Sequence, residues 1–171
     1  QKNTQLCLHE SIIVNGLVKL ASDIGIIPKE ENLEIITKIH GSIVAQNADV
    51  KCYIKAKNLE VSGQIQKLNI LETHATSTTI SSNGSISDVE KFDLSSGSLE
   101  VHGQIERMKT LKTNAPSTKI SSSGTIREIS EKFDLESEWL THDGKIEKCP
   151  KLDLFAWGAI CNGKIENGKT Y

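Results

Sequence analysis

Aliphatic residues stand at fixed distances from a series of glycines along most of this chain. A valine or isoleucine follows each of these glycines by two positions, and further apolar residues stand two and four positions before most of them. Apolar residues at every second position are typical of a β-strand with one buried face, whereas an amphipathic helix repeats every three to four residues. Successive glycines lie 19 to 25 residues apart, and they are Gly16, Gly41, Gly63, Gly84, Gly103, Gly124, Gly144 and Gly163.

Aligning the chain on these glycines places apolar residues in columns. The column four positions before the glycine contains Leu59, Ile80, Leu99, Ile120 and Leu140, and the column five positions after it contains Leu68, Val89, Met108, Ile129 and Cys149. Columns of this kind describe a β-solenoid, in which short strands pair with the coils on either side and the aliphatic columns fill the bore. A glycine at a fixed place indicates a backbone that bends with positive φ or passes close to its neighbour.

Part of the chain is an internal repeat. Leu59–Ile65 returns as Leu99–Ile105, and Ile80–Ile86 returns as Ile120–Ile126, both with a shift of 40 residues. A repeat of this length indicates one supersecondary unit stacked on copies of itself. We therefore predict an all-β fold, a right-handed parallel β-helix of about eight coils of roughly 20 residues each. We expect an internal column that stacks Ile65, Ile86, Ile105, Ile126 and Ile146.

The prediction covers 1–171 as a single solenoid domain, with an N-terminal arm at 1–11, coils at 12–165 and a C-terminal tail at 166–171. Residues 1–10 are polar, which is typical of a terminal arm or an edge. The longest interval between glycines contains Ile26–Asn32, where a proline and charged residues predict a loop that projects from the stack. A helical turn is the alternative for this segment.

Composition and charge narrow the possible partners. The net charge is −2 and no basic cluster stands out, which argues against nucleic acid, because a phosphate-binding surface needs concentrated positive charge. We expect no transmembrane segment, since no apolar run approaches the roughly 20 residues that a membrane helix needs. The chain begins with Gln1 instead of Met, as expected of a processed or truncated chain, so the compartment stays open.

Four cysteines leave disulfides open. Cys149 and Cys161 fall in apolar columns, and the sequence favours small buried side chains without a bond between them for both. Cys7 and Cys52 lie in the less regular part of the chain, where neither state is favoured.

We expect no enzyme, cofactor or metal site. The intervals from Gly63 onward vary only between 19 and 21 residues, which leaves little chain for the walls of a catalytic cleft. The acidic residues are interpreted as a solvated face, and they include Asp88, Glu90, Asp93, Asp134 and Glu136. The histidines are scattered without metal-ligand spacing and are interpreted as surface residues, among them His40, His102 and His142.

The run Gly41–Val50 followed by Ile54–Ile65 resembles the repeats of bactofilins, with Gly-x-Ile-x-Ala and then Leu-x-Val-x-Gly-x-Ile. This resemblance implies a right-handed triangular β-helix that polymerises end to end into nucleotide-independent filaments. Asn83-Gly-Ser-Ile86 is similar instead to filamentous-haemagglutinin-type adhesin repeats, which implies a surface or secreted module that presents a face to a glycan or protein. The two resemblances imply a bacterial cytoplasmic filament or an extracellular fibre.

The ends of the predicted solenoid carry the functional hypothesis. Each end would present unpaired backbone groups and apolar residues, a template for another copy unless something covers it. We expect a head-to-tail homopolymer whose contacts include Ile12, Ile13, Leu17, Phe155, Trp157 and Ile160. The alternative is a monomer, in which Ile26–Asn32 folds over the first coils and Phe155–Trp157 plugs the last.

Overall fold

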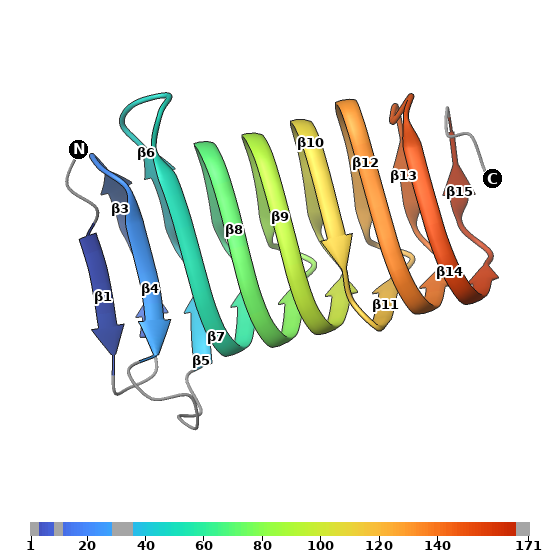
Figure 1. Cartoon of the computed structure of the whole chain (residues 1–171), viewed down its shortest axis with the longest axis horizontal. Coiled ribbons are helices and arrows are strands. Elements are labelled where there is room, and N and C mark those ends of the chain that lie inside the picture. Colours follow the sequence, from blue (N-terminus) through green and yellow to red (C-terminus); the bar gives the residue numbers. More distant parts are fainter. Residues whose placement is uncertain (1–3, 9–11, 29–35, 167–171) are drawn as a thin grey trace.

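Parallel strands stacked side by side form the whole described part of the protein. The structure is a computed structural model, and it describes residues 4–8, 12–28 and 36–166. For residues 4–8 and 28 it describes the backbone alone. These residues contain fifteen strands and no helix. All strand pairs are parallel, and successive strands follow one another along one axis (Figure 1). The predicted β-solenoid is therefore confirmed, while its handedness stays a prediction.

The strands form three ladders, and the longer strands pass round a corner from one ladder into the next. Ladder one begins with β1 (Thr4–Leu8) and β4 (Ile24–Pro28), ladder two with β2 (Ile12–Val14) and β5 (Ile36–Ile39), and ladder three with β3 (Leu17–Leu20) and β6 (Ser42–Ala45). The remaining strands are β7 (Lys51–Val61), β8 (Gln64–Ile80), β9 (Ser85–Val101), β10 (Gln104–Asn114), β11 (Ser117–Ile120), β12 (Thr125–His142), β13 (Lys145–Glu147), β14 (Leu152–Cys161) and β15 (Lys164–Ile165). About seven turns separate the first row of strands from the last.

The bore is filled by columns of aliphatic side chains. The predicted isoleucine column is confirmed, because its members pair in register along ladder three and are all buried; they are Ile43, Ile65, Ile86, Ile105, Ile126 and Ile146. Ladder one adds a column in which Phe92 and Phe133 alternate with leucines and are also buried. The alternation of buried and exposed positions along each strand is the source of the period of two in the sequence.

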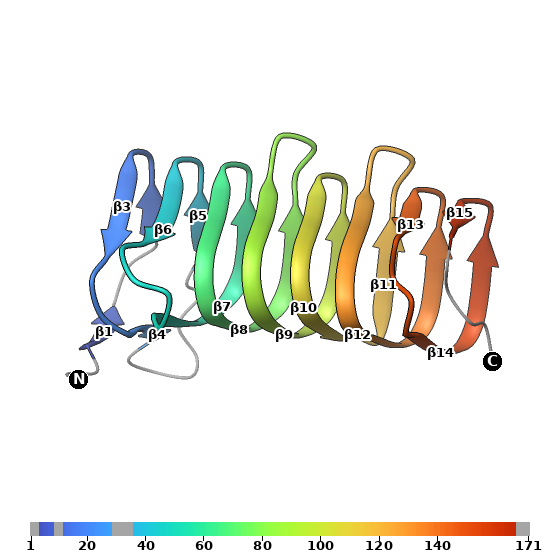
Figure 2. The ribbon, with the colours of Figure 1, turned by 90° about the horizontal axis from the view of Figure 1, so that it is seen from above.

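Two members of one predicted column are misplaced. Ile80 pairs with Val61 and Val101, not with Leu59 and Leu99, and Thr78 occupies the place between those two leucines. Ile120 is shifted in the same way, with Thr118 beside Leu99 and Leu140. The cause is the turn before Gly84 and before Gly124, which is two residues longer than its neighbours and forms the two taller loops in Figure 2. A shift of two keeps each side chain on the same face, so the bore is unaffected.

The recurring glycines lie where the backbones of successive coils approach most closely. No described glycine has positive φ, so the prediction that these glycines bend the backbone with positive φ is wrong. The alternative prediction, a close approach to the neighbouring coil, is confirmed. A Cβ atom added to Gly63 would lie under 3.0 Å from the carbonyl oxygen of Gly41, and Gly103 meets the carbonyl oxygen of Gly84 in the same way. Any side chain at this corner would push the coils apart.

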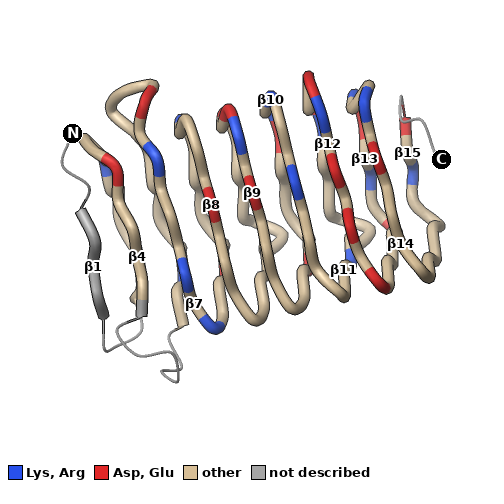
Figure 3. The backbone as a smooth tube through the Cα atoms, viewed as in Figure 1, with Lys and Arg blue, Asp and Glu red and all other residues tan. Residues whose placement is uncertain are grey.

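Positive φ occurs at a different corner, between ladder three and ladder one. Four positions after the glycine, five consecutive rows have a left-handed residue with a charged side chain: Lys67, Asp88, Arg107, Glu128 and Lys148. This conformation costs an L-residue about 1–2 kcal/mol. The charges alternate in sign from row to row, and Figure 3 shows how acidic and basic positions are interspersed along the solenoid.

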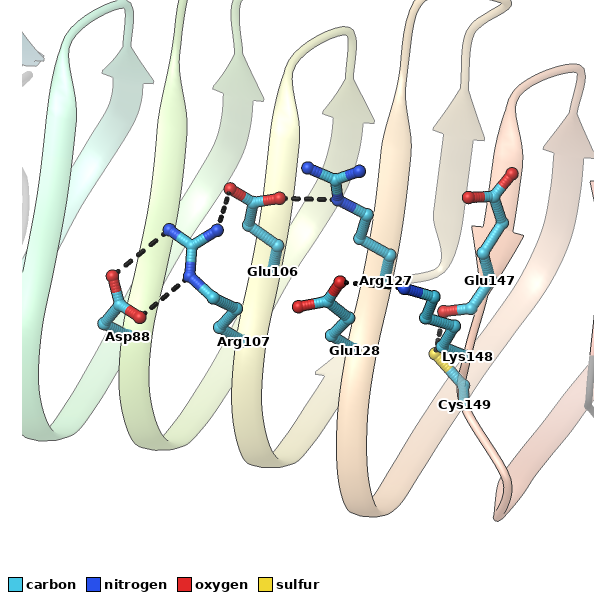
Figure 4. Close-up of polar contacts among 8 residues, drawn as sticks. All are labelled: Asp88, Glu106, Arg107, Arg127, Glu128, Glu147, Lys148 and Cys149. Carbon is cyan, nitrogen blue, oxygen red and sulfur yellow. Dashed lines mark hydrogen bonds and ion pairs between the residues drawn. The ribbon is translucent and has the colours of Figure 1, made fainter.

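Ion pairs connect the rows at this charged corner (Figure 4). Arg107 donates two hydrogen bonds to Asp88, from Nε at 2.9 Å and from Nη2 at 3.2 Å. Glu106 has a nearly buried carboxylate that accepts from Arg107 on one side and from Arg127 on the other, each at 2.6 Å. The hydrogen bond from Arg107 lowers the pKa of Asp88 below its ordinary value. The pairs offset part of the conformational cost, although partly exposed pairs contribute only about 0–1 kcal/mol each.

The first rows of the solenoid include segments that the sequence assigned to an arm and a loop. Residues 4–8 form β1, which pairs with β4, so this part of the predicted arm is the edge of ladder one. Ile26–Pro28 belongs to β4 and is not part of a loop, because its backbone pairs with β1 as far as Pro28 and with β7 as far as Ile26. Residues 29–32 lie outside the described part of the chain.

We expect the substitution Ile105→Asp to lower the free energy of unfolding by several kcal/mol, because it buries an unpaired carboxylate in the bore. The measurement is chemical denaturation followed by far-UV circular dichroism. Gln104→Asp, at an exposed neighbouring position, is the control and should leave stability nearly unchanged. A wild-type spectrum dominated by helix would contradict the fold itself.

We expect Gly103→Ala to destabilise the protein by about 3 kcal/mol, the upper end of the range for overpacking, because the new methyl group meets a backbone carbonyl that cannot move alone. Thermal unfolding measures the loss, with Gln104→Ala as the control. An unchanged melting temperature for Gly103→Ala would show that the coils do not approach as closely as described.

Candidate interaction surfaces at the two ends

Both ends of the solenoid have strands that are paired on one side only. Within the described residues, β1, β2 and β3 at the N-terminal end pair only with β4, β5 and β6. At the C-terminal end, β14 pairs only with β12, and β15 pairs only with β13. The outer edges of these strands therefore present backbone N–H and C=O groups without strand partners, which is the usual template for strand addition.

Among the described residues, no row covers the bore at the C-terminal end. Ala159 and Cys161 continue the inward columns of Leu140 and His142, which are buried, yet both are exposed because no further described row covers them. Ile165, the last member of the isoleucine column, is only half-buried.

The N-terminal end shows the same feature. Ile12, Val14 and Val18 pair with buried residues of the next row and so face the bore. Ile12 and Val14 are half-buried, and Val18 is 38% exposed. Apolar atoms of the bore are thus accessible at both ends of the described structure.

The six predicted contact residues lie in the terminal rows but not all on the end faces. Ile12 faces the bore, whereas the other five are exposed on the outside of the coils: Ile13, Leu17, Phe155, Trp157 and Ile160. Phe155 and Trp157 are 58% and 77% exposed, so neither ring plugs the bore as the monomer alternative required.

One outward column on ladder two is polar in every inner row and apolar at both ends. Its inner members are Lys38, Glu60, Thr79, Glu100, Lys119 and Thr141. The terminal members are Ile13 and Ile160, which are 56% and 61% exposed. Exposed isoleucines in this column therefore occur only where a row lacks a neighbour.

Aromatic side chains gather on the outside of the last two rows. Trp139 lies over Gly158, because a Cβ added to that glycine would meet the indole ring. Phe155 and Trp157 line a hollow of about 140 Å³ together with Glu136 and Glu138. Aromatic rings beside carboxylates can contact a sugar or a cationic group.

His142 is a core residue that the sequence interpretation missed. Its side chain is buried, Nε2 lies 3.2 Å from the carbonyl oxygen of Lys164, and Nδ1 has no hydrogen-bond partner. Burial lowers the pKa of His142 below its ordinary value of 6.5. Its place two residues before Gly144, in the column of Val61 and Val101, was the signal that could have revealed it. By contrast, His40 is exposed, and His102 is half-buried with Nε2 at 2.8 Å from Glu100.

The three cysteines with described side chains are free. Cys149 is buried as predicted, whereas Cys161 occupies the predicted inward column but is exposed in the last row. Cys52 is buried too, and burial raises the pKa of its thiol to about 12. The side chain of Cys7 lies outside the described residues.

Over 4–8, 12–28 and 36–166 no grouping of His, Cys, Asp and Glu suits a metal ion. The same residues contain no helix with the length and apolar character needed to span a bilayer.

Replacing His142 by Val should raise the free energy of unfolding at pH 7 by about 1 kcal/mol, because a buried nitrogen without a partner is removed. The pKa of His142 is lower in the folded protein than in the unfolded chain, so below pH 6.5 the imidazole binds a proton more readily in the unfolded chain. The wild-type protein therefore loses stability as the pH falls. The variant should lack this loss. Urea denaturation between pH 7.5 and 5 measures it, with exposed His74→Val as the control. Identical pH slopes for His142→Val and wild type would contradict the burial of His142.

Comparison with protein-family models finds no match, and comparisons with curated proteins and with solved structures return none that is significant.

Proposed function

We propose that this chain is a structural, non-enzymatic β-solenoid that assembles end to end into filaments or fibres. The observation that carries the proposal is that, within the described residues, the outermost strands of all three ladders have an unpaired edge and the apolar bore residues beside them are accessible. A second copy supplies what each end lacks, namely strand partners and cover for the bore.

The chemistry of the outer column supports this proposal. A polar residue suits a position whose neighbours on both sides are surrounded by water, whereas Ile13 and Ile160 expose aliphatic surface without any gain in an isolated monomer. Burying such a side chain completely contributes about 1.5–3 kcal/mol. The N-terminal and C-terminal ends are different surfaces, so a contact between them is heterologous and propagates as a filament.

The resemblance to bactofilin repeats agrees with this function, because those proteins polymerise through the ends of a β-helix. An adhesin-type module is the second candidate, and the aromatic cluster around Trp139, Phe155 and Trp157 favours it. In that case the lateral face of the last rows meets a glycan or a surface protein, and the ends play no part.

Electron microscopy and light scattering over a range of protein concentrations test the assembly. We expect filaments as wide as one solenoid or a bundle of them, and we expect Ile160→Lys to weaken assembly because it places a charge at the joint. Thr141→Lys is the matched control, since it adds the same charge in the same column one row inward. A wild-type protein that stays monomeric at high concentration under all salt conditions, while it binds a glycan array, would replace this proposal with the adhesin function.

A further inference from the structure

Nothing among the described residues requires a glycine at position 16. A Cβ atom added to Gly16 meets no described atom within 4 Å. Its φ is not in the left-handed region, because no described glycine has positive φ. Neither close approach nor backbone conformation within the described chain therefore requires a glycine at this position.

The other seven glycines of the series all need to be glycines. At each of them an added Cβ would lie under 3.0 Å from a backbone carbonyl oxygen of the preceding row; they are Gly41, Gly63, Gly84, Gly103, Gly124, Gly144 and Gly163. Gly16 differs because it belongs to the first row, which no described row precedes. The same constraint would act on Gly16 if another row were stacked on the N-terminal end.

We propose that the row before Gly16 is the last row of a second copy, so that the joint between two copies continues the solenoid in register. The inference rests on the proposed end-to-end assembly and specifies its geometry. Between successive rows, a backbone carbonyl at or near the glycine of one row faces the glycine of the next. The carbonyl oxygen of Gly144, for example, faces Gly163. At the joint the carbonyl of Gly163 takes that position against Gly16 of the next copy.

The side-chain columns support the same register. Counted from the two glycines, Ile160 of one copy stands beside Ile13 of the next on the outside of ladder two, which brings together the two exposed isoleucines of an otherwise polar column. On the inside, Cys161 stands beside Val14, and Ile165 stands beside Val18. All three pairs are apolar, and the two inner pairs cover bore residues that are partly or fully exposed in one copy.

The register also determines the polarity of the filament. Every described ladder is parallel, and a continued ladder is parallel only when the C-terminal end of one copy meets the N-terminal end of the next. A two-fold joint between like ends would pair the strands antiparallel, and a joint of this kind centred on ladder two would place Ile13 against Ile13 or Ile160 against Ile160.

Gly16→Ala tests the role of the glycine. We expect the variant monomer to melt at the same temperature as wild type or higher, because the methyl group has free space and alanine restricts the unfolded chain. We expect its critical concentration for assembly to rise by at least about tenfold, since the methyl group meets a carbonyl at the joint. Lys19→Ala, on the exposed side of the same row, is the control and should assemble like wild type.

Cysteine cross-linking tests the polarity, in a background with Cys7→Ser and Cys161→Ser that is first shown to assemble. Neighbouring residues of a parallel ladder are about 4.8 Å apart, within the range that a disulfide spans. A mixture of Ile13→Cys and Ile160→Cys proteins should form mixed disulfides on oxidation, identified by mass spectrometry. Neither variant alone should cross-link to itself.

The outcomes separate this inference from the proposed function. Filaments that form equally well with Gly16→Ala, or self-cross-links from a single variant, overturn the register and polarity and leave end-to-end assembly standing. The absence of any assembly by the wild-type protein overturns both. Loss of assembly in Gly16→Ala with an intact melting transition, together with mixed disulfides alone, supports the continuous joint.

Discussion

The coils of this protein rest on one another through a contact between backbones that leaves no room for a side chain. At one corner of each turn the α-carbon of a glycine faces a carbonyl of the coil before it, and even a methyl group would overlap that oxygen. The spacing of parallel strands sets how close two coils must come, and glycine is the residue that permits it. The contact recurs in every described row from Gly41 onward, and it keeps the aliphatic columns of successive coils in register.

The corner between ladder three and ladder one holds the coils together in a different way. Between ladder three and ladder one the chain adopts a left-handed conformation, yet the residues there are charged and none is glycine. Their alternating signs let each side chain attract the next along the axis, as Asp88 and Arg107 do, and the nearly buried Glu106 lies between two arginines. The glycine corner therefore brings the backbones of successive coils close together, and the charged corner adds electrostatic attraction between the coils on their outer surface.

Periodicity was enough to predict the solenoid and the column of Ile65, Ile86 and Ile105, because inward positions must repeat in every coil. Counting from the glycine failed at Ile80 and Ile120, since a longer turn adds two residues without changing which side faces inward. The left-handed corner was not predicted, because a single charged residue carries no mark of positive φ. His142 was misassigned because its polarity was given more weight than its column. The ends were predicted to be apolar, but only the paired rows show which of their residues face inward.

The position of the aromatic residues has a practical consequence. The chain contains two tryptophans, Trp139 and Trp157, and both lie in the last two rows. Trp139 is stacked on Gly158, while Trp157 projects into the surrounding solvent. Indole emission depends on the polarity around the ring, so the tryptophan fluorescence of the unlabelled protein, excited where tyrosine does not absorb, reports on the C-terminal rows. Tryptophan emission can therefore follow events at one end of the described solenoid without a label, and it does not respond to changes in the first rows.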